Sequence, residues 1–200
     1  MTDYFALLNE PRRPWLDADL LKEKFLTLSA SVHPDRVHHL GEAERAAAQE
    51  RYTELNAAYH HLREPRERLH HLLELELGSL PKDVQRIPSE LMDLSLEVGE
   101  ACREGDAFLA EKAKVTSPLL QVAFFERGQE FADKLQALRQ RVNSLNEGLN
   151  AELKQIDGAW QSDPSPRDGL LNRLETLYRL FSYFARWTAQ IQERVVRLSF

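Results

Sequence analysis

The stretch Val32-His33-Pro34-Asp35-Arg36 separates two segments whose apolar residues recur with the spacing of an amphipathic helix. Residues 18–32 carry apolar side chains one, three or four positions apart, and residues 42–63 repeat this pattern. A proline fixes its own φ and disfavours helical geometry in the residue before it. The sequence therefore predicts two helices joined by a stiff, exposed loop over residues 33–40.

The remaining segments also favour helices. A short helix begins at Asp3 and is interrupted by two prolines, and another covers residues 66–76 with Gly78 as its C-terminal stop. Helix-forming residues dominate nearly every segment, and only 8 of the 200 residues are glycine. We therefore predict an all-α protein. The further helices are expected over residues 89–103, 106–114, 119–157 and 170–198.

Three regions follow from this pattern. Residues 1–77 form a compact N-terminal helical domain, and residues 78–88, which contain one glycine and two prolines, form a linker. Residues 89–200 form a second helical domain. Because its long helices have short connections, we expect an antiparallel helical bundle.

The composition indicates which classes of partner and which cellular compartment to expect. The formal net charge of −6 makes nucleic acid an unsuitable partner. No apolar run approaches the ~20 residues that span a bilayer, and residues 1–10 lack the features of a signal peptide, so we expect no membrane partner and a cytoplasmic protein. Cys102 is the single cysteine, which fits a reducing compartment, and we expect it to be a small apolar residue on a helix.

His33, Pro34 and Asp35 carry the clearest chemical signal. Pro34 creates a rigid corner, from which His33 and Asp35 project a pair of hydrogen-bonding side chains. No nucleophile or set of oxyanion donors accompanies them, so the corner suits docking to a partner better than catalysis, and we expect no enzyme. The alternative is an ordinary turn between helices, with Asp35 as a local cap.

The helix, His-Pro-Asp loop, helix arrangement resembles a J domain, and further stretches resemble HscB, the J-type co-chaperone of iron–sulfur cluster assembly. The similarity covers the first 78 residues closely and the rest loosely. It is carried by the opening Asp3-Tyr4-Phe5-Ala6-Leu7-Leu8, by Leu55-Asn56-Ala57-Ala58-Tyr59 with Leu62, Pro65 and Arg68, by Leu72-Leu73-Glu74-Leu75-Glu76-Leu77-Gly78, and by Gln190-Ile191-Gln192-Glu193-Arg194-Val195.

The resemblance implies a co-chaperone that stimulates the ATPase of a DnaK/HscA-type chaperone and delivers an IscU-type scaffold for iron–sulfur cluster maturation. It implies no cofactor of its own. The residues that the resemblance assigns to chaperone binding are His33, Pro34, Asp35, Lys24 on the preceding helix, and Arg36, which replaces the usual lysine. Ala30 stands where the family usually has another basic residue, a loss that affects docking on an acidic surface.

The resemblance also implies a scaffold-binding surface on the first helix of the bundle. The family uses a Leu-Met pair and spaced glutamates there, and an aromatic residue on the last helix. The matching residues are Leu91, Met92, Leu96, Glu97, Glu100 and Glu104, with Phe181 as the aromatic, although Tyr178 and Tyr183 are alternatives. A different interpretation is that the three apolar residues belong to the bundle core and the glutamates to a solvated face.

Two features depart from the family. The bundle is longer by roughly thirty residues, around residues 106–127, and residues 181–187 are unusually aromatic. The pairs His38-His39, His60-His61 and His70-His71 suggest a metal, but Pro65 separates the last two pairs and no clear ligand set is complete, so we expect no metal and exposed imidazoles.

Three hypotheses follow. The first is the HscB-like co-chaperone. The second keeps the J domain and gives the bundle a different protein client of a DnaK-type chaperone. The third is a metal-dependent enzyme built on the histidine pairs. The sequence leaves the oligomeric state open.

Overall fold

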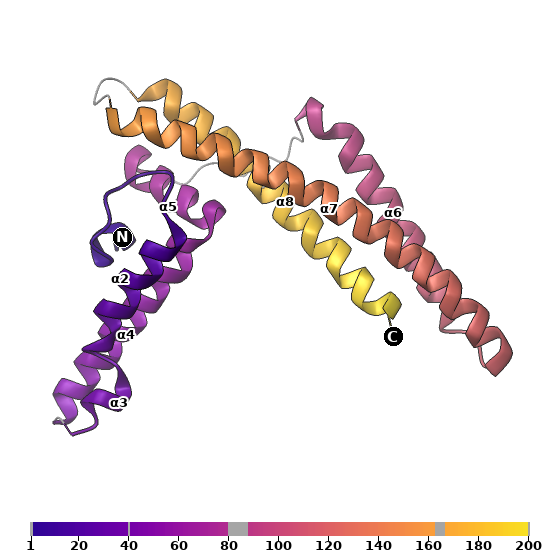
Figure 1. Ribbon diagram of the computed structural model, residues 1–200, viewed down its shortest axis with the longest axis horizontal. Coiled ribbons are helices and arrows are strands. Elements are labelled where there is room, and N and C mark those ends of the chain that lie inside the picture. The colour runs from indigo at the N-terminus through magenta and orange to yellow at the C-terminus, as the bar shows by residue number, and fades with distance from the viewer. Residues whose placement is uncertain (1, 40, 80–87, 163–166, 200) are drawn as a thin grey trace. The chain divides into compact units, whose positions relative to one another are not determined.

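The computed structural model describes residues 2–39, 41–79, 88–162 and 167–199, and within these ranges it contains helices and no strands (Figure 1). The all-α prediction is confirmed. The elements in chain order are α1 (Tyr4–Leu7), α2 (Ala18–Ala30), α3 (Pro34–Val37), α4 (Glu42–Arg63), α5 (Pro65–Leu77), the 3-10 turn η1 (Ser89–Leu91), α6 (Met92–Lys112), α7 (Pro118–Ser162) and α8 (Asp168–Ser199).

The chain divides into two compact units. One contains Met1–Lys82 with Asn150–Tyr178, and the other contains Asp83–Leu149 with Arg179–Phe200, so α7 and α8 each contribute to both. The division at residues 77 and 89 expected from the sequence stays a prediction, and residues 80–87 of the expected linker lie outside the described residues.

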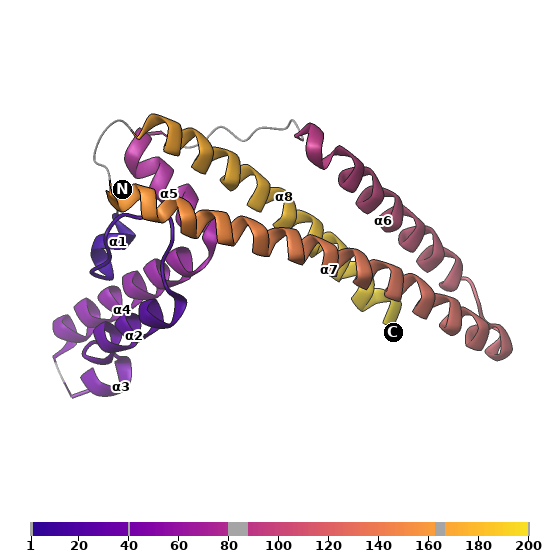
Figure 2. The same ribbon diagram turned by 45° about the horizontal axis from the view of Figure 1, so that its top comes forward.

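Helices α2 and α4 lie side by side in the N-terminal unit (Figures 1 and 2). The side chain of Asp17 accepts hydrogen bonds from the backbone of Asp19 and Leu20, which caps α2 as expected. The Phe25 and Tyr59 rings stack with centroids 4.5 Å apart, and fully buried residues on α1, α4 and α5 complete the core. Each buried leucine or phenylalanine stabilises the fold by about 1.5–3 kcal/mol.

Residues 11–17 are fixed by buried polar groups. The Arg68 guanidinium, 3% exposed, donates hydrogen bonds to the backbone oxygens of Pro14 (2.8 Å) and Leu62 (2.6 Å). Burial lowers the pKa of Arg68 to about 10, so it remains charged at neutral pH. The Trp160 indole, on the last turn of α7, donates to the Arg12 carbonyl at 2.9 Å. The loop after α1 therefore has a defined course.

The second unit is built from α6, the first part of α7 and the last part of α8. α6 and α7 are antiparallel neighbours (Figures 1 and 2), and Arg194 on α8 donates to the Asp106 carboxylate on α6 at 2.7 Å. The antiparallel packing expected of the bundle is present here. Buried residues of all three helices form the core, among them Leu94, Val98, Phe108, Leu135, Val142 and Ile191.

Two predicted boundaries were wrong. The expected helix over residues 89–103 and the piece over 106–114 form η1 and the single helix α6. Gly105 lies buried inside this helix and does not end it. The expected loop over residues 33–40 contains one helical turn, α3, which starts at Pro34 as proline at a first helical position favours.

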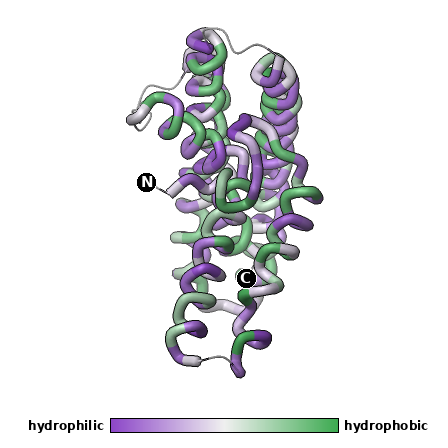
Figure 3. Tube along the Cα trace, turned by 90° about the vertical axis from the view of Figure 1, so that its left-hand side faces the viewer, coloured by the Kyte–Doolittle hydropathy of each residue, from purple (hydrophilic) through white to green (hydrophobic). Residues whose placement is uncertain are grey.

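Hydropathy along the chain alternates within each helix instead of forming one long apolar run (Figure 3). Among the described residues, none of the helices has the length and apolar character that crossing a bilayer requires.

Candidate functional site

The His33-Pro34-Asp35 corner is held by local hydrogen bonds and by α4. His33 has extended backbone geometry and is the N-cap of α3, and its Nδ1 accepts a hydrogen bond from the Asp35 backbone N–H at 3.3 Å. The His33 ring meets the Tyr52 ring edge-on, with centroids 5.3 Å apart. Since Pro34 fixes the first helical φ, the corner is rigid before any partner binds.

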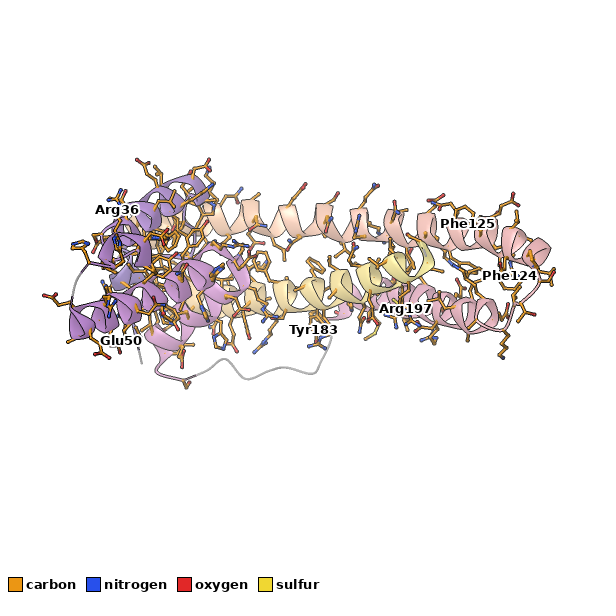
Figure 4. The ribbon with its side chains drawn as sticks, turned by 90° about the horizontal axis from the view of Figure 1, so that it is seen from below. Arg36, Glu50, Phe124, Phe125, Tyr183 and Arg197 are labelled. Carbon is orange, nitrogen blue, oxygen red and sulfur yellow. The ribbon has the colours of Figure 1, made fainter. Side chains whose placement is uncertain are left out.

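The Asp35 carboxylate projects from this corner. Its side chain is 89% exposed, and Oδ2 lies 3.7 Å from His33 Nδ1. The Arg36 side chain is also exposed (Figure 4). The corner therefore presents a carboxylate from Asp35 and a guanidinium from Arg36, which can form charge-assisted hydrogen bonds with a partner.

Lys24, which the resemblance assigned to chaperone binding, has partners within the N-terminal unit. Its Nζ lies 2.7 Å from Glu10 Oε1 and donates to the Asn9 backbone oxygen at 3.2 Å. Within the described residues, Lys22 is exposed on the same helix and no ion pair or hydrogen bond is recorded for it. Sequence reasoning missed Lys22, although its place between the core positions Leu21 and Phe25 was a signal of exposure.

The α6 surface separates into exposed and ion-paired residues. Met92 and Leu96 are 44% and 58% exposed, and Glu100, four positions further, is exposed on the same row. Glu97 is paired with Arg141 (2.6 Å) and Glu104 with Lys134 (2.5 Å), both on α7. The structure brings together Met92, Leu96 and Glu100 as a row with a thioether, an aliphatic and an acidic group.

Two residues expected on this surface are buried. Leu91 is 8% exposed and Phe181 is 4% exposed, so each contributes to the core of the second unit. Tyr183 is likewise buried at 6%, and the ring of Tyr178 lies 5.5 Å from that of His70 in the N-terminal unit.

Among the histidine pairs, His71 is buried, whereas His38, His39 and His60 are exposed. His71 is 4% exposed, its Nε2 accepts a hydrogen bond from the Tyr4 backbone N–H at 3.0 Å, and burial lowers its pKa. The expectation of exposed imidazoles was therefore wrong for His71, because α1 covers it. In the part of the chain that the structure describes, no group of three or more His, Cys, Asp or Glu is arranged to hold a metal ion.

No family model matches the chain. A co-chaperone protein HscB homolog from Azoarcus sp. (strain BH72) is 38% identical over 107 residues, which are 52% of this chain and 60% of that protein. The homolog from Paraburkholderia phymatum is 39% identical over 72 residues, 36% of this chain and 41% of that protein. The matched stretches span less than two thirds of these relatives.

Solved structures extend the likeness to the whole fold. Chaperone HscB from Vibrio cholerae superposes with a TM-score of 0.60 at 20% identity, covering 96% of each chain. Human co-chaperone protein HscB gives 0.59 at 18% identity, covering 98% of this chain and 81% of that one. The chain therefore has the all-α fold of these two HscB structures. More narrowly, the resemblance to HscB inferred from the sequence is confirmed.

Proposed function

We propose that this chain is a co-chaperone that stimulates ATP hydrolysis by a DnaK/HscA-type chaperone and delivers an IscU-type scaffold for iron–sulfur cluster maturation. The observation that carries the proposal is the rigid His33-Pro34-Asp35 corner with its exposed carboxylate, at the end of the α2–α4 pair, in a chain whose relatives are named HscB co-chaperones.

The corner acts by docking and performs no chemistry of its own. The Asp35 carboxylate and the Arg36 and Lys22 cations bind the ATP-bound chaperone, and His33 keeps the corner in shape through its bond to the Asp35 N–H. Binding that favours the hydrolysis-competent conformation shifts the chaperone toward it. ATP hydrolysis is the chaperone's reaction.

The scaffold binds the exposed row on α6. Met92 and Leu96 supply apolar contact that adapts to a partner surface, and Glu100 supplies negative charge without a recorded intramolecular partner among the described residues. Glu97 and Glu104 are in ion pairs with Arg141 and Lys134. They contact the scaffold either after these ion pairs break or as intact ion pairs. Leu91 and Phe181 are buried and take no direct part in this binding.

The test is single-turnover ATP hydrolysis by purified DnaK or HscA-type chaperone, with and without this chain, and with an IscU-type scaffold added. We expect stimulation by the chain, and more than additive stimulation with scaffold. His33→Gln should retain the helical circular-dichroism signal and lose stimulation, because the ring that orients the corner is gone.

Each result has a defined consequence. Full stimulation by His33→Gln would contradict the docking role of the corner. Stimulation that ignores the scaffold would favour the second candidate, a J-domain co-chaperone with a different client. Absence of stimulation with either chaperone would remove the co-chaperone proposal.

A further inference from the structure

A groove of about 670 Å³ opens to solvent on the N-terminal unit, between residues 9–17 and helix α2. This volume lies in the range of sites that receive a small ligand or a few side chains. Its apolar lining is contributed by Pro11, Trp15, Leu16, Leu20 and Leu28. The hydrogen bonds of Arg68 to Pro14 and of Trp160 to Arg12 fix residues 9–17 as one wall, so the groove exists before a ligand arrives.

Leu20 is an exposed apolar side chain of this groove. It is 59% exposed, whereas its neighbour Leu21 is 1% exposed in the core. Trp15 lies on the opposite wall and is half-buried. A ligand side chain between them would remove apolar surface of both residues from water, which favours binding.

The charges of the lining select the sign of the ligand. Arg13 is already paired with Asp157 and Lys24 with Glu10, so both cations of the lining are matched. Asp17 and Glu23 also line the groove. Asp17 uses Oδ1 to cap α2, and for Glu23 no ion pair is recorded within the described residues. Lys154 stands over the Trp15 ring at 4.7 Å but is not part of the lining. Among the residues that the structure describes, the charged groups of the lining that have no ion-pair partner are therefore the carboxylates of Asp17 and Glu23.

We propose that this groove binds a peptide segment of a partner protein in which aliphatic side chains flank an arginine or lysine. The aliphatic groups pack against Trp15 and Leu20, and the cation pairs with Glu23. A guanidinium or ammonium so placed forms charge-assisted hydrogen bonds, which makes the binding sensitive to salt. The site needs no chaperone and is independent of the proposed function.

The test is fluorescence anisotropy with the full chain and a fluorescein-labelled peptide of sequence Gly-Leu-Arg-Leu-Leu-Gly. We expect saturable binding that weakens as salt is raised. Leu20→Asp and Glu23→Lys should each weaken it by about tenfold or more, the effect of losing one good contact. Leu26→Asp is the matched control, because Leu26 is 54% exposed on the same helix but lies outside the groove.

Three outcomes would overturn the proposal: no saturable binding at millimolar protein, equal binding of the peptide with Glu in place of Arg, or equal loss of binding in Leu20→Asp and Leu26→Asp. Both leucines are exposed, so circular-dichroism melts of the two variants should match the parent chain and exclude unfolding as the cause. Chaperone stimulation is measured separately, so failure here leaves the proposed function untouched.

Discussion

Asp157 near the end of α7 binds the Arg13 guanidinium, 144 residues earlier in the chain, through both carboxylate oxygens. The Nε–Oδ1 distance is 2.9 Å, the same Oδ1 accepts from the Trp15 backbone N–H at 3.3 Å, and Gln161 Nε2 donates to Oδ2 at 2.8 Å. Asp157 is 3% exposed. A buried carboxylate with four donors fixes residues 13–15 to α7 within the N-terminal unit.

Asp157→Ala should lower the free energy of unfolding by about 3–5 kcal/mol, because it leaves the Arg13 charge partly buried without its partner. Urea denaturation followed by circular dichroism measures the change. The matched control is Glu54→Gln in the exposed Arg51–Glu54 pair, where we expect a loss of about 0–1 kcal/mol. Equal losses in the two variants would contradict a structural role for Asp157.

His71 should make the stability depend on pH. Burial lowers the pKa of His71 in the folded state below its ordinary value of 6.5, so the unfolded chain binds the proton more readily. Stability from this group is therefore fully present above about pH 6.5 and is lost as the pH falls below it. We expect His71→Gln to flatten the unfolding free energy between about pH 5 and 7.

The control for this prediction is His60→Gln, an exposed imidazole on α4. Its pH profile should follow that of the parent chain. If His71→Gln retained the full pH dependence, the responsible group would have to be elsewhere.

Replacing Gly78 or Gly148 by alanine should change the free energy of unfolding in opposite directions. Gly78 ends α5 with φ of +69°, where a Cβ is strained, so Gly78→Ala should destabilise by about 1 kcal/mol. Gly148 lies inside α7 with open space around its Cα, so Gly148→Ala should stabilise by about 0.5–1 kcal/mol. Thermal melts of the pair measure both, and a shared sign would contradict the assigned conformation of one of them.

Charge removal on α2 should distinguish the two lysines of this helix in the proposed docking. Lys22→Gln removes an exposed cation and should slow chaperone association several-fold at low salt, with a smaller effect at high salt. Lys24→Gln removes a charge already paired with Glu10 and should have the smaller effect. Stopped-flow association rates measure both, and the reverse order would assign docking to Lys24.

Substitution of Leu96 in the α6 row should affect scaffold binding, whereas substitution of the buried Phe181 should affect folding stability. Leu96→Asp should weaken binding of an IscU-type scaffold in calorimetry and leave the melting temperature nearly unchanged, because Leu96 is exposed. Phe181→Ala should instead destabilise by about 3–5 kcal/mol through a core cavity. Leu145→Asp on α7, also exposed, is the control that should change neither property. Unchanged scaffold binding in Leu96→Asp would contradict the proposed row.

The helices and their ends were predictable because their causes are local. The Asp17 cap, the Gly78 stop and the apolar spacing of α2 and α4 act within a few residues, and the helix over residues 42–63 begins and ends as expected. The His33-Pro34-Asp35 corner was found for the same reason, since its rigidity depends on a proline and one hydrogen bond between residues two positions apart.

The partners and the burial of individual side chains could be identified only from the tertiary structure. Lys24 and Lys22 are chemically alike in the sequence, and only the return of residues 9–10 beside α2 pairs one of them. Likewise Leu91 and Leu96 were both expected on the scaffold-binding surface, and packing buries the first and exposes the second.

By itself, the sequence determined an all-α chain with a rigid polar corner, because capping, proline geometry and helical periodicity are properties of neighbouring residues. The resemblance to HscB co-chaperones was carried separately, by matching motifs along the chain. The tertiary structure decided which of those residues remain available to a partner. Burial and ion pairing, as in Arg13 with Asp157, join residues far apart in the chain, and their strength depends on the surroundings that folding creates.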